Sequence, residues 1–555
     1  MKKLLPILSL LSLLLIAAGQ GCKQFSLNTD DLELSVDMNI IKTNVTIRFL
    51  DAATDELIGF DNDNRIRVTV HGPDSLNVLT TSGERKPQYF SAAGYLSLGL
   101  DPYKAKPTAD DPVDFTLVAQ LPGYISTSLP VTLVSEGGFD FIVRMVNEGD
   151  PPDGVAIKSE ENAGTATGGD LEEDIKINTD NKEVDITISK GTTLKDEEGQ
   201  PLEGELSVTM AHFNPTEQDA LSAFPGGLNV KVKNESENED AGVFVSAGFV
   251  SIDITDQNGK KAALFEGGGL NLNAQIDTKV LNPETGQPVQ AGDIIPFWSY
   301  NDETGEWKFE RNIQVEASPM GLQVSTRLPH LSWWNIDWFD AACAFVEIYF
   351  TTDQADKTGA TGWGYGLRWI AQLVGGDASY QSEGYFAGFP ELTGIMSVLN
   401  TERLQSVPYN KQIQITFFAE GEHPLWQTPD PITYDFCAES PVEVPLTPNA
   451  STGGGSDLLT ITFTVSIYCT DLGTSANIPD NTLLRYRKKG TSTWTTISAS
   501  SNQVTIGGLE QNTVYEVQAL YDGAWIPSPA FEYLVEPSTE TNLSKTLTFN
   551  LNCGG

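Results

Sequence analysis

One short stretch of the sequence places a nucleophile beside a base. In His330-Leu331-Ser332 a histidine stands two residues before a serine. A serine hydroxyl helped by a histidine can attack the preceding carbonyl and cleave the chain, provided that the fold strains that peptide bond. The alternative, which we favour, is that both side chains cap a strand beside the Trp333 and Trp334 core. Self-cleavage between Leu331 and Ser332 is therefore kept as a hypothesis.

The cysteines point to an oxidising compartment. Cys22 follows an apolar N-terminal run and is the candidate for lipid attachment, which leaves an even number of cysteines for disulfides. Three pairings are open, and the positions favour Cys343 with Cys437 and Cys469 with Cys553. Closing loops of this length would stabilise each domain by about 4–5 kcal/mol. A zinc site is not expected, because there is no Cys-x-x-Cys and no histidine near a cysteine.

Residues 1–22 have the pattern of an export signal. Two lysines precede the apolar run Leu4–Ala18, which is too short for a good membrane span, and small residues precede Cys22. The segment resembles a bacterial lipoprotein signal, whose cysteine is acylated after cleavage; the alternative is ordinary secretion with a free Cys22. Lys23 after the cysteine implies passage to the outer membrane. The Asp30-Asp31 pair is similar to the export tags of Bacteroidetes surface lipoproteins.

Aromatic and acidic clusters provide two further candidates. Trp363 and Trp369 lie in a glycine-rich aromatic stretch, and exposed tryptophans can stack on sugar rings; Trp426 and Trp525 are weaker candidates of the same kind. The alternative, which we favour, is that the stretch forms core strands. Residues 61–64, Asp-Asn-Asp-Asn, offer oxygens to calcium but lack the later glycine and glutamate of an EF-hand, so a plain turn is favoured.

The charge balance excludes one class of partner. The formal net charge is −41, and the one short basic run is 485–489, so the chain repels nucleic acid. No metal ligands cluster, and no motif pairs carboxylates or sets a nucleophile beside its base, apart from the stretch already described. We therefore expect no enzyme, no nucleic-acid partner and no cofactor, with calcium as the open exception.

Hydrophobic patterning predicts an all-β protein. Alternation of apolar and polar residues at 66–70, 184–189 and 459–467 is typical of half-buried strands. We predict a string of four Ig- or fibronectin-like β-sandwiches after a lipoprotein signal peptide. The expected parts are a signal peptide (1–21), a flexible tether (22–33), a first sandwich (34–147), an acidic glycine-rich linker (148–178), a second β domain (179–338), a disulfide-closed third sandwich (339–446) and a fourth sandwich (447–555).

Residues 296–338 hold five of the ten tryptophans, and their motifs resemble a known family. Asn301–Gly305 reads as the turn of a hairpin between Trp298 and Trp307. Together with the segments 214–226 and 330–337, this order of parts resembles the ectodomain shared by cartilage intermediate layer protein and its bacterial surface relatives. The resemblance covers 179–338. It implies an extracellular, adhesive or structural role with no catalytic residues.

Two other domains resemble common extracellular modules. The first sandwich is similar to carboxypeptidase regulatory-like domains, which carry no catalysis. The fourth resembles a fibronectin type III domain, which implies that Leu509 fills the core and that the Tyr515 hydroxyl bonds to upstream backbone. Gln511 departs from the family pattern, which has a proline after the leucine.

These observations predict a non-enzymatic cell-surface lipoprotein of the outer membrane. It would be held by a lipid on Cys22 and would contact an extracellular protein or glycan in an adhesive or structural role. The alternative is a carbohydrate-binding lipoprotein for polysaccharide capture, which would use the exposed aromatic side chains.

Overall fold

The computed structural model confirms the all-β class. It describes residues 36–551 except 38–40, 60–63, 228, 237–238, 302–303, 352–366, 375–380, 387–397, 409–410, 420–427, 440, 446–457, 471–472, 479–481, 500–501 and 541. Within these residues the helical elements are short: α2 (Gln218–Ser222), α3 (Phe436–Glu439) and a 3₁₀ turn at Ser75–Asn77. No helix in the described part of the chain is both long and apolar enough to span a membrane.

The first sandwich packs two four-stranded sheets, β4-β6-β2-β9 and β5-β3-β7-β8, around one core. Val45, Ile47 and Phe49 of β2 alternate into that core, as strand geometry requires. The strands are β2 (Thr43–Asp51), β3 (Arg67–His71), β4 (Val78–Thr80), β5 (Tyr89–Phe90), β6 (Tyr95–Leu100), β7 (Val113–Gln120), β8 (Thr127–Leu133) and β9 (Gly137–Met145).

The second domain is built from one long sheet and a separate two-stranded pair, β20-β21. The order of the long sheet is β12-β13-β19-β24-β23-β22-β25-β17-β15-β10-β11-β14-β18, with β16 beside β17 and β23. The strands are β10 (Val155–Thr167), β11 (Asp170–Leu171), β12 (Ile175–Asn178), β13 (Val184–Ile188), β14 (Thr193–Lys195), β15 (Gly204–Phe213), β16 (Asn229–Lys233), β17 (Glu239–Asp256), β18 (Leu264–Glu266), β19 (Leu270–Ile276), β20 (Leu281–Asn282), β21 (Gln287–Pro288), β22 (Ile294–Asn301), β23 (Glu306–Ser318), β24 (Gly321–Leu328) and β25 (Trp333–Thr351).

The prediction of a flexible linker at 148–178 is wrong, because β10, β11 and β12 lie within it. β10 pairs with β15 along its length. The acids that suggested a linker point outward, while Ala166, Leu171 and Ile175 enter the core. Gly164 marks a bulge in the pairing, and a side chain there would clash with Ile175.

The predicted boundary between residues 338 and 339 is also wrong. β25 runs through it without a break, pairing first with β17 and β22 and later with β28 and β31. The stretch Trp338–Cys343 contains no glycine or proline that would end a strand. The third sandwich therefore begins on a strand of the second. Its other strands are β26 (Leu367–Leu373), β27 (Gln381–Phe386), β28 (Val398–Pro408), β29 (Ile413–Ala419), β30 (Ile432–Tyr434) and β31 (Val442–Pro445).

The fourth sandwich has the features expected of a fibronectin-like domain. Leu509 is buried in its core, and the Glu510 backbone N–H donates to the Tyr515 hydroxyl at 3.1 Å, as predicted. The chain's first described strand, β1 (Val36–Asp37), joins this domain by pairing with β33. The other strands are β32 (Leu458–Cys469), β33 (Thr474–Asn477), β34 (Leu483–Lys488), β35 (Thr495–Ser498), β36 (Gln503–Glu510), β37 (Thr513–Tyr521), β38 (Ala524–Val535) and β39 (Asn542–Leu551).

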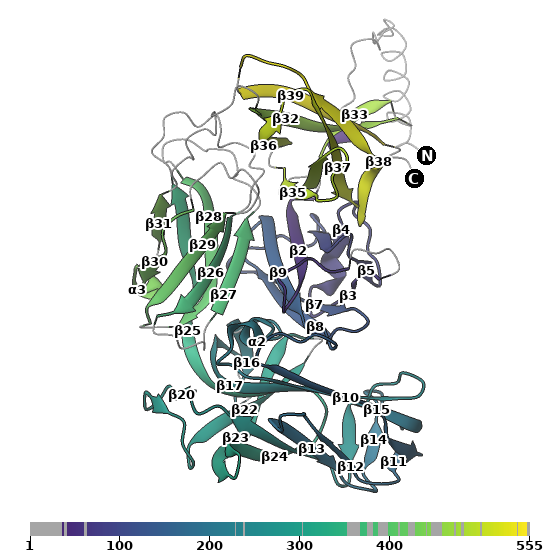
Figure 1. Ribbon diagram of the computed structural model, residues 1–555, viewed down its shortest axis with the longest axis vertical. Helices are drawn as coiled ribbons and strands as arrows, with labels where there is room; N and C mark the ends of the chain where they lie inside the picture. Colours follow the sequence, from purple (N-terminus) through teal and green to yellow (C-terminus); the bar gives the residue numbers. More distant parts are fainter. Residues whose placement is uncertain are drawn as a thin grey trace, which may run out of the picture.

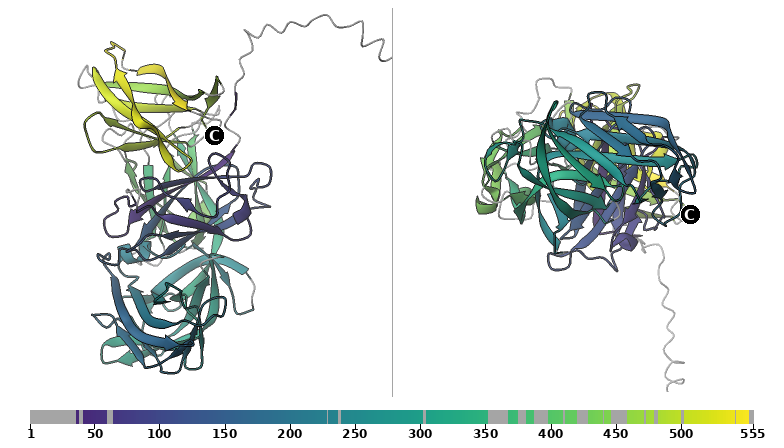
Figure 2. Two further views of the ribbon diagram at one scale, coloured as in Figure 1. Left: turned by 90° about the vertical axis from the view of Figure 1, so that its right-hand side faces the viewer. Right: turned by 90° about the horizontal axis from the view of Figure 1, so that it is seen from below.

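The four domains do not follow one another in single file, as a simple string would. The fourth sandwich lies at one end, the first and third lie side by side in the middle, and the second lies at the opposite end (Figures 1 and 2). The first sandwich touches all three others, through contacts described below. The molecule is therefore a braced stack of domains with a distinct end at β1 and another at the second domain.

Candidate functional site

The tryptophan-rich segment forms core rather than an exposed site. β22 and β23 form the expected antiparallel hairpin, and Trp298, Trp307, Trp333, Trp334 and Trp338 are each at most 6% exposed. The rings of Phe297 and Trp334 stack with centroids 4.9 Å apart, and the Trp298 indole N–H donates to the Asp337 carbonyl at 2.9 Å. These side chains close the second domain.

A buried polar pair lies inside this core. The Asn335 side-chain amide donates to the Asp337 carboxyl at 2.5 Å, and the Ala247 backbone N–H donates to the same carboxyl at 3.2 Å. Burial raises the pKa of Asp337 to about 8, against the opposing hydrogen bonds from Ser246, Asn335 and Ala247. Burial therefore favours the neutral form of Asp337, whose carboxyl accepts hydrogen bonds from Ala247 on β17 and Asn335 on β25.

The His330–Ser332 stretch is held by structural contacts. The Tyr300 backbone N–H donates to the Ser332 hydroxyl at 2.9 Å, and that hydroxyl donates back to the Tyr300 carbonyl at 2.5 Å. The His330 ring lies 3.4 Å from Glu310 Oε1 and 4.8 Å, centroid to centroid, from Trp334. Ser332 thus ties β22 to the start of β25. Its hydroxyl hydrogen is committed to a backbone carbonyl, as the favoured interpretation predicts.

Of the aromatic residues proposed to stack on sugars, Trp369 and Trp525 lie within the described residues. Trp369 is 3% exposed in the core of the third sandwich, so the candidate role in sugar stacking is wrong for this residue and the favoured interpretation, core strands, is confirmed. Its strand, β26, is the inner strand between β27 and β29. Trp525 is engaged between two sandwiches. Trp363, Trp426 and residues 61–63 of the proposed calcium turn lie outside the described residues, and Asn64, its last residue, is exposed.

Two predicted disulfide cysteines are described, and both are disulfide-bonded: Cys437 on α3 and Cys469 at the end of β32. Cys553 and the lipidation residue Cys22 lie outside the described residues, and Cys343 is described only as a backbone position on β25. The two pairings therefore stay predictions. Among the described residues, no three His, Cys, Asp or Glu side chains are grouped so as to hold a metal ion.

An ionic cluster joins the first and third sandwiches and faces the second. The buried Arg144 guanidinium donates to Asp55 at 2.9 Å, and Arg368 of β26 lies 3.3 Å from the other oxygen of the same carboxylate. Burial opposes ionisation of Asp55, but Arg144 and Arg368 outweigh it and hold its pKa below the usual value. Asp219 of α2 interacts electrostatically with both Asp55 and Arg144.

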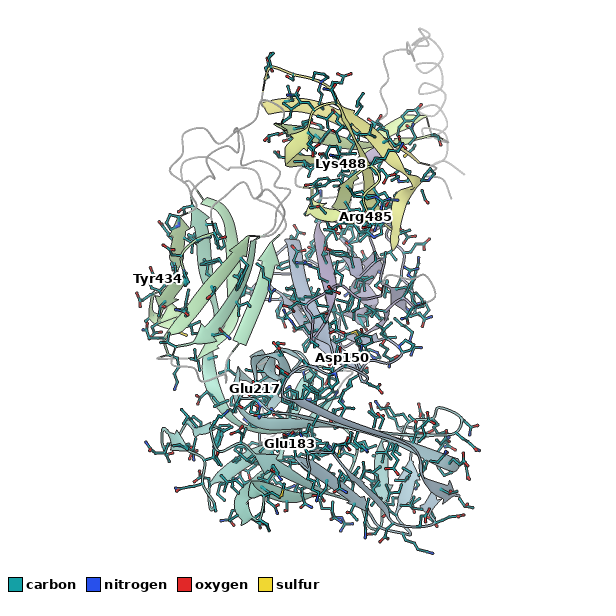
Figure 3. The ribbon with its side chains drawn as sticks, in the orientation of Figure 1. Asp150, Glu183, Glu217, Tyr434, Arg485 and Lys488 are labelled. Atoms are coloured by element: carbon teal, nitrogen blue, oxygen red, sulfur yellow. The ribbon has the colours of Figure 1, made fainter. Side chains whose placement is uncertain are left out.

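An aromatic cluster joins the first and fourth sandwiches. Tyr95 and Trp525 meet edge to face with ring centroids 6.1 Å apart, and the Trp525 indole N–H donates to the Ala92 carbonyl at 3.1 Å. Leu483 and Leu520 are buried in the same contact. Arg485, on the fourth sandwich in Figure 3, lies 4.4 Å from the Trp525 ring centroid.

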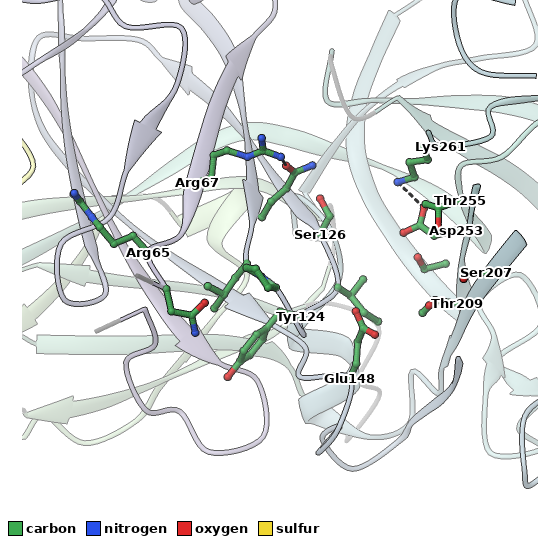
Figure 4. Close-up of a pocket in the computed structure, with 16 residues that line it drawn as sticks. Arg65, Arg67, Tyr124, Ser126, Glu148, Ser207, Thr209, Asp253, Thr255 and Lys261 are labelled. Carbon is green, nitrogen blue, oxygen red and sulfur yellow. Dashed lines mark hydrogen bonds and ion pairs between the residues drawn. The ribbon is translucent and has the colours of Figure 1, made fainter. Parts of the chain in front are cut away.

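A cleft lined by both polar and apolar residues lies between the first sandwich and the second domain. Its volume is about 560 Å³, within the range that small ligands occupy. In Figure 4, Ser207, Thr209, Asp253 and Thr255 line one side, with Tyr124 and Ser126 opposite. Because the two sides come from distant parts of the sequence, sequence reasoning missed the cleft. The only available signal was the row of small polar residues alternating with apolar ones in β15 and β17.

Charges of both signs line this cleft. Lys261 Nζ lies 2.5 Å from the Asp253 carboxylate, and Arg67 donates to the Gln120 side-chain carbonyl. Burial and the negative charge of Asp253 raise the pKa of Glu148, while a hydrogen bond with Ser159 lowers it. The cleft therefore offers hydrogen-bond donors and acceptors without a strong charge of one sign.

Comparison with known proteins gives weak likeness in shape only. No family model matches the chain, and no curated protein matches it. The shaft pilin SpaA of Lactobacillus rhamnosus GG is 8% identical, with 37% of this chain and 97% of that chain covered and a TM-score of 0.16. The minor pilin of Streptococcus agalactiae is 9% identical over 37% and 94% of the chains, with a TM-score of 0.14. Chicken CNTN1 FN1–FN3 domains are 9% identical over 48% and 94%, with a TM-score of 0.10.

Proposed function

We propose that this chain is a non-enzymatic cell-surface lipoprotein that serves in adhesion or as a structural element of the cell envelope. One observation carries the proposal. β1, directly after the expected tether, pairs with β33, with Val36 opposite Ala476 and Asp37 opposite Asn477. A lipid on Cys22 would then attach the molecule at its fourth sandwich, and the second domain would lie farthest from the membrane.

The bracing between domains supports a role in display. β25 continues from the second domain into the third, and the hydroxyl of Ser128 in the first sandwich donates to that of Tyr300 in the second at 2.9 Å. Ile125 and Val146 of the first sandwich join a hydrophobic cluster of the second domain. Such contacts limit hinge motion and suit a protein that holds a binding surface away from the cell.

The proposed location in the outer membrane and the proposed family resemblance both rest on the sequence. The signal segment and Cys22 favour the outer membrane, and the motifs at 298–307 and 330–337 favour relatives of the cartilage intermediate layer protein ectodomain. In the β32–β39 pair, Leu551 lies opposite Cys469. Cys553 follows Leu551 by two residues, which supports the proposed disulfide between Cys469 and Cys553. The alternative function, polysaccharide capture, cannot use the buried Trp369 for sugar stacking. It would require a different sugar-binding surface.

The proposal is tested by expressing the protein in a bacterium that exports lipoproteins and determining how its N-terminus is modified and where the protein is located. Mass spectrometry should find acyl chains on Cys22 as the first residue, and protease added to intact cells should degrade the protein. The Cys22→Ser variant should lack acyl chains and leave the membrane fraction. A free thiol at Cys22, or a wild-type protein that stays soluble, contradicts the proposal.

A further inference from the structure

The cleft between the first sandwich and the second domain has an ordered polar floor. β15 and β17 pair in a register that sets Ser207 opposite Thr255 and Thr209 opposite Asp253. Because alternate residues of a strand share one face, these four side chains project together, while their neighbours Val208 and Ile254 are buried in the core. The floor is thus a small grid of hydroxyls with one carboxylate, which is paired with Lys261.

The opposite wall comes from the first sandwich. Tyr124 presents a half-buried ring, fixed by its hydroxyl, which donates to Asp51 at 3.0 Å. Ser126 adds a hydroxyl, Glu148 adds a carboxyl, and Arg67 brings an exposed guanidinium to the lining. The wall therefore combines an aromatic surface with hydrogen-bonding groups, across from the grid.

The chemistry of the lining excludes several ligand classes. An extended peptide would bind by adding a strand to a free sheet edge, but β15 and β17 are both paired on each side, in the order β10-β15-β17-β25. The mixed charges do not suit a polyanion, and the apolar residues Leu121, Pro122 and Ile125 lie beside the polar ones, so the lining fits a ligand with both hydroxyl groups and apolar faces. Hydroxyl side chains both donate and accept, and carboxylates accept, so together they match neighbouring sugar hydroxyls. An aromatic ring can cover the apolar face of a sugar.

We propose that the cleft between the first sandwich and the second domain binds a short segment of a neutral polysaccharide. Sugar hydroxyls bond to Thr209, Asp253 and Thr255 on the floor, and Glu148 receives hydroxyls from the wall side. Because the ligand touches both domains, it holds them together. The proposal stands on the cleft alone and is independent of lipid attachment at Cys22.

The test is binding of the purified full-length protein to an array of neutral oligosaccharides of glucose, galactose, mannose and xylose, with acidic saccharides on the same array. The strongest neutral ligand is then titrated by calorimetry. Ser207→Trp, which fills the floor, should weaken binding at least 10-fold. Asn271→Trp places the same side chain at an exposed position of β19 in the same domain and should leave affinity unchanged.

Glu148→Ala, on the other wall, should also weaken binding, which keeps the test valid if Ser207→Trp fails to fold. Thermal unfolding of the wild type should shift upward with the sugar. The proposal is overturned if no neutral oligosaccharide binds, if only acidic ones bind, or if Ser207→Trp and Glu148→Ala both bind like the wild type. Loss of lipid from Cys22→Ser would not alter any of these results.

Discussion

The first sandwich is fastened to its neighbours by two contrasting junctions. Toward the fourth sandwich the contact is aromatic, with Trp525 against Tyr95 and two buried leucines around them. Toward the third it is ionic, with Asp55 between Arg144 and Arg368. We call these the aromatic junction and the ionic junction. They lie on the same small domain but depend on different physical forces.

The difference predicts different responses to solution conditions. The aromatic junction gains from apolar burial and ring contacts, which are insensitive to pH in the neutral and acidic range. The ionic junction depends on the charge of Asp55, and Arg144 is only 6% exposed, so loss of that charge leaves a buried cation without its acid. The end of the molecule nearest β1 should therefore stay assembled under conditions that loosen the middle.

The largest effect is expected from Trp525→Ala at the aromatic junction. It removes the ring contact with Tyr95 and the hydrogen bond to Ala92, and should weaken the junction by about 2–3 kcal/mol, less than for a fully buried tryptophan. Calorimetry should show the fourth sandwich unfolding earlier. Trp494→Ala is the control, because Trp494 also contacts Arg485 but is absent from the Tyr95–Trp525 cluster. Equal effects of the two variants would contradict the assignment.

A smaller loss is expected from Asp55→Asn at the ionic junction. Asn tolerates the positive φ of 57° at this turn, so the substitution removes charge without adding strain. The association of the first and third sandwiches should weaken by about 2 kcal/mol, because Asp55 is partly exposed and Arg144 is not. Hydrogen exchange should rise in β26. The exposed Asp111→Asn should change nothing, and unaltered exchange in both variants would refute the role of the pair.

The pH response should separate the two junctions. The pKa of Asp55 is lower in the folded protein than its usual 3.8, so its stabilising contribution is complete above about pH 4 and is lost as the pH falls below that value. Small-angle X-ray scattering should show expansion of the wild type near pH 3, while contacts at Trp525 persist. In Asp55→Asn this acid-induced expansion should be reduced. Expansion of equal size in both proteins would assign it to other groups.

The smallest effect should come from Lys86→Ala. Lys86 lies 3.3 Å from Asp522 at the rim of the aromatic junction, and both side chains are about one-third exposed. Exposed ion pairs contribute about 0.2–1 kcal/mol, so the unfolding temperature should hardly move. A loss as large as that of Trp525→Ala would show that the aromatic junction depends on charge after all.

The features that could be predicted from the sequence are those determined by residues close together along the chain. Residues 184–188 alternate within a few positions, and β13 forms there with Val184, Ile186 and Ile188 buried. The corner at Tyr515 was likewise predictable, because its backbone partner is five residues away. These features depend on neighbours along the chain.

The failures involve contacts that are distant in sequence. The acids at 170–174 looked like a linker, but β10 is stabilised by β15, about 50 residues later. For Trp369 the sequence left both a core position and an exposed site open, because nothing local reveals that β26 lies between two partners. The cleft joins Tyr124 to Asp253, and no sequence period connects those positions.

The most direct test of the account is the orientation of the lipid-anchored molecule on a membrane. Ser475→Cys on β33, beside β1, and Thr285→Cys in the β20–β21 turn of the second domain place dyes at exposed sites in the two end domains. The labelled lipoprotein is reconstituted into vesicles containing acceptor lipids. Attachment at the fourth sandwich predicts strong energy transfer from position 475 and weak transfer from position 285. Equal transfer, or stronger transfer from position 285, would contradict it.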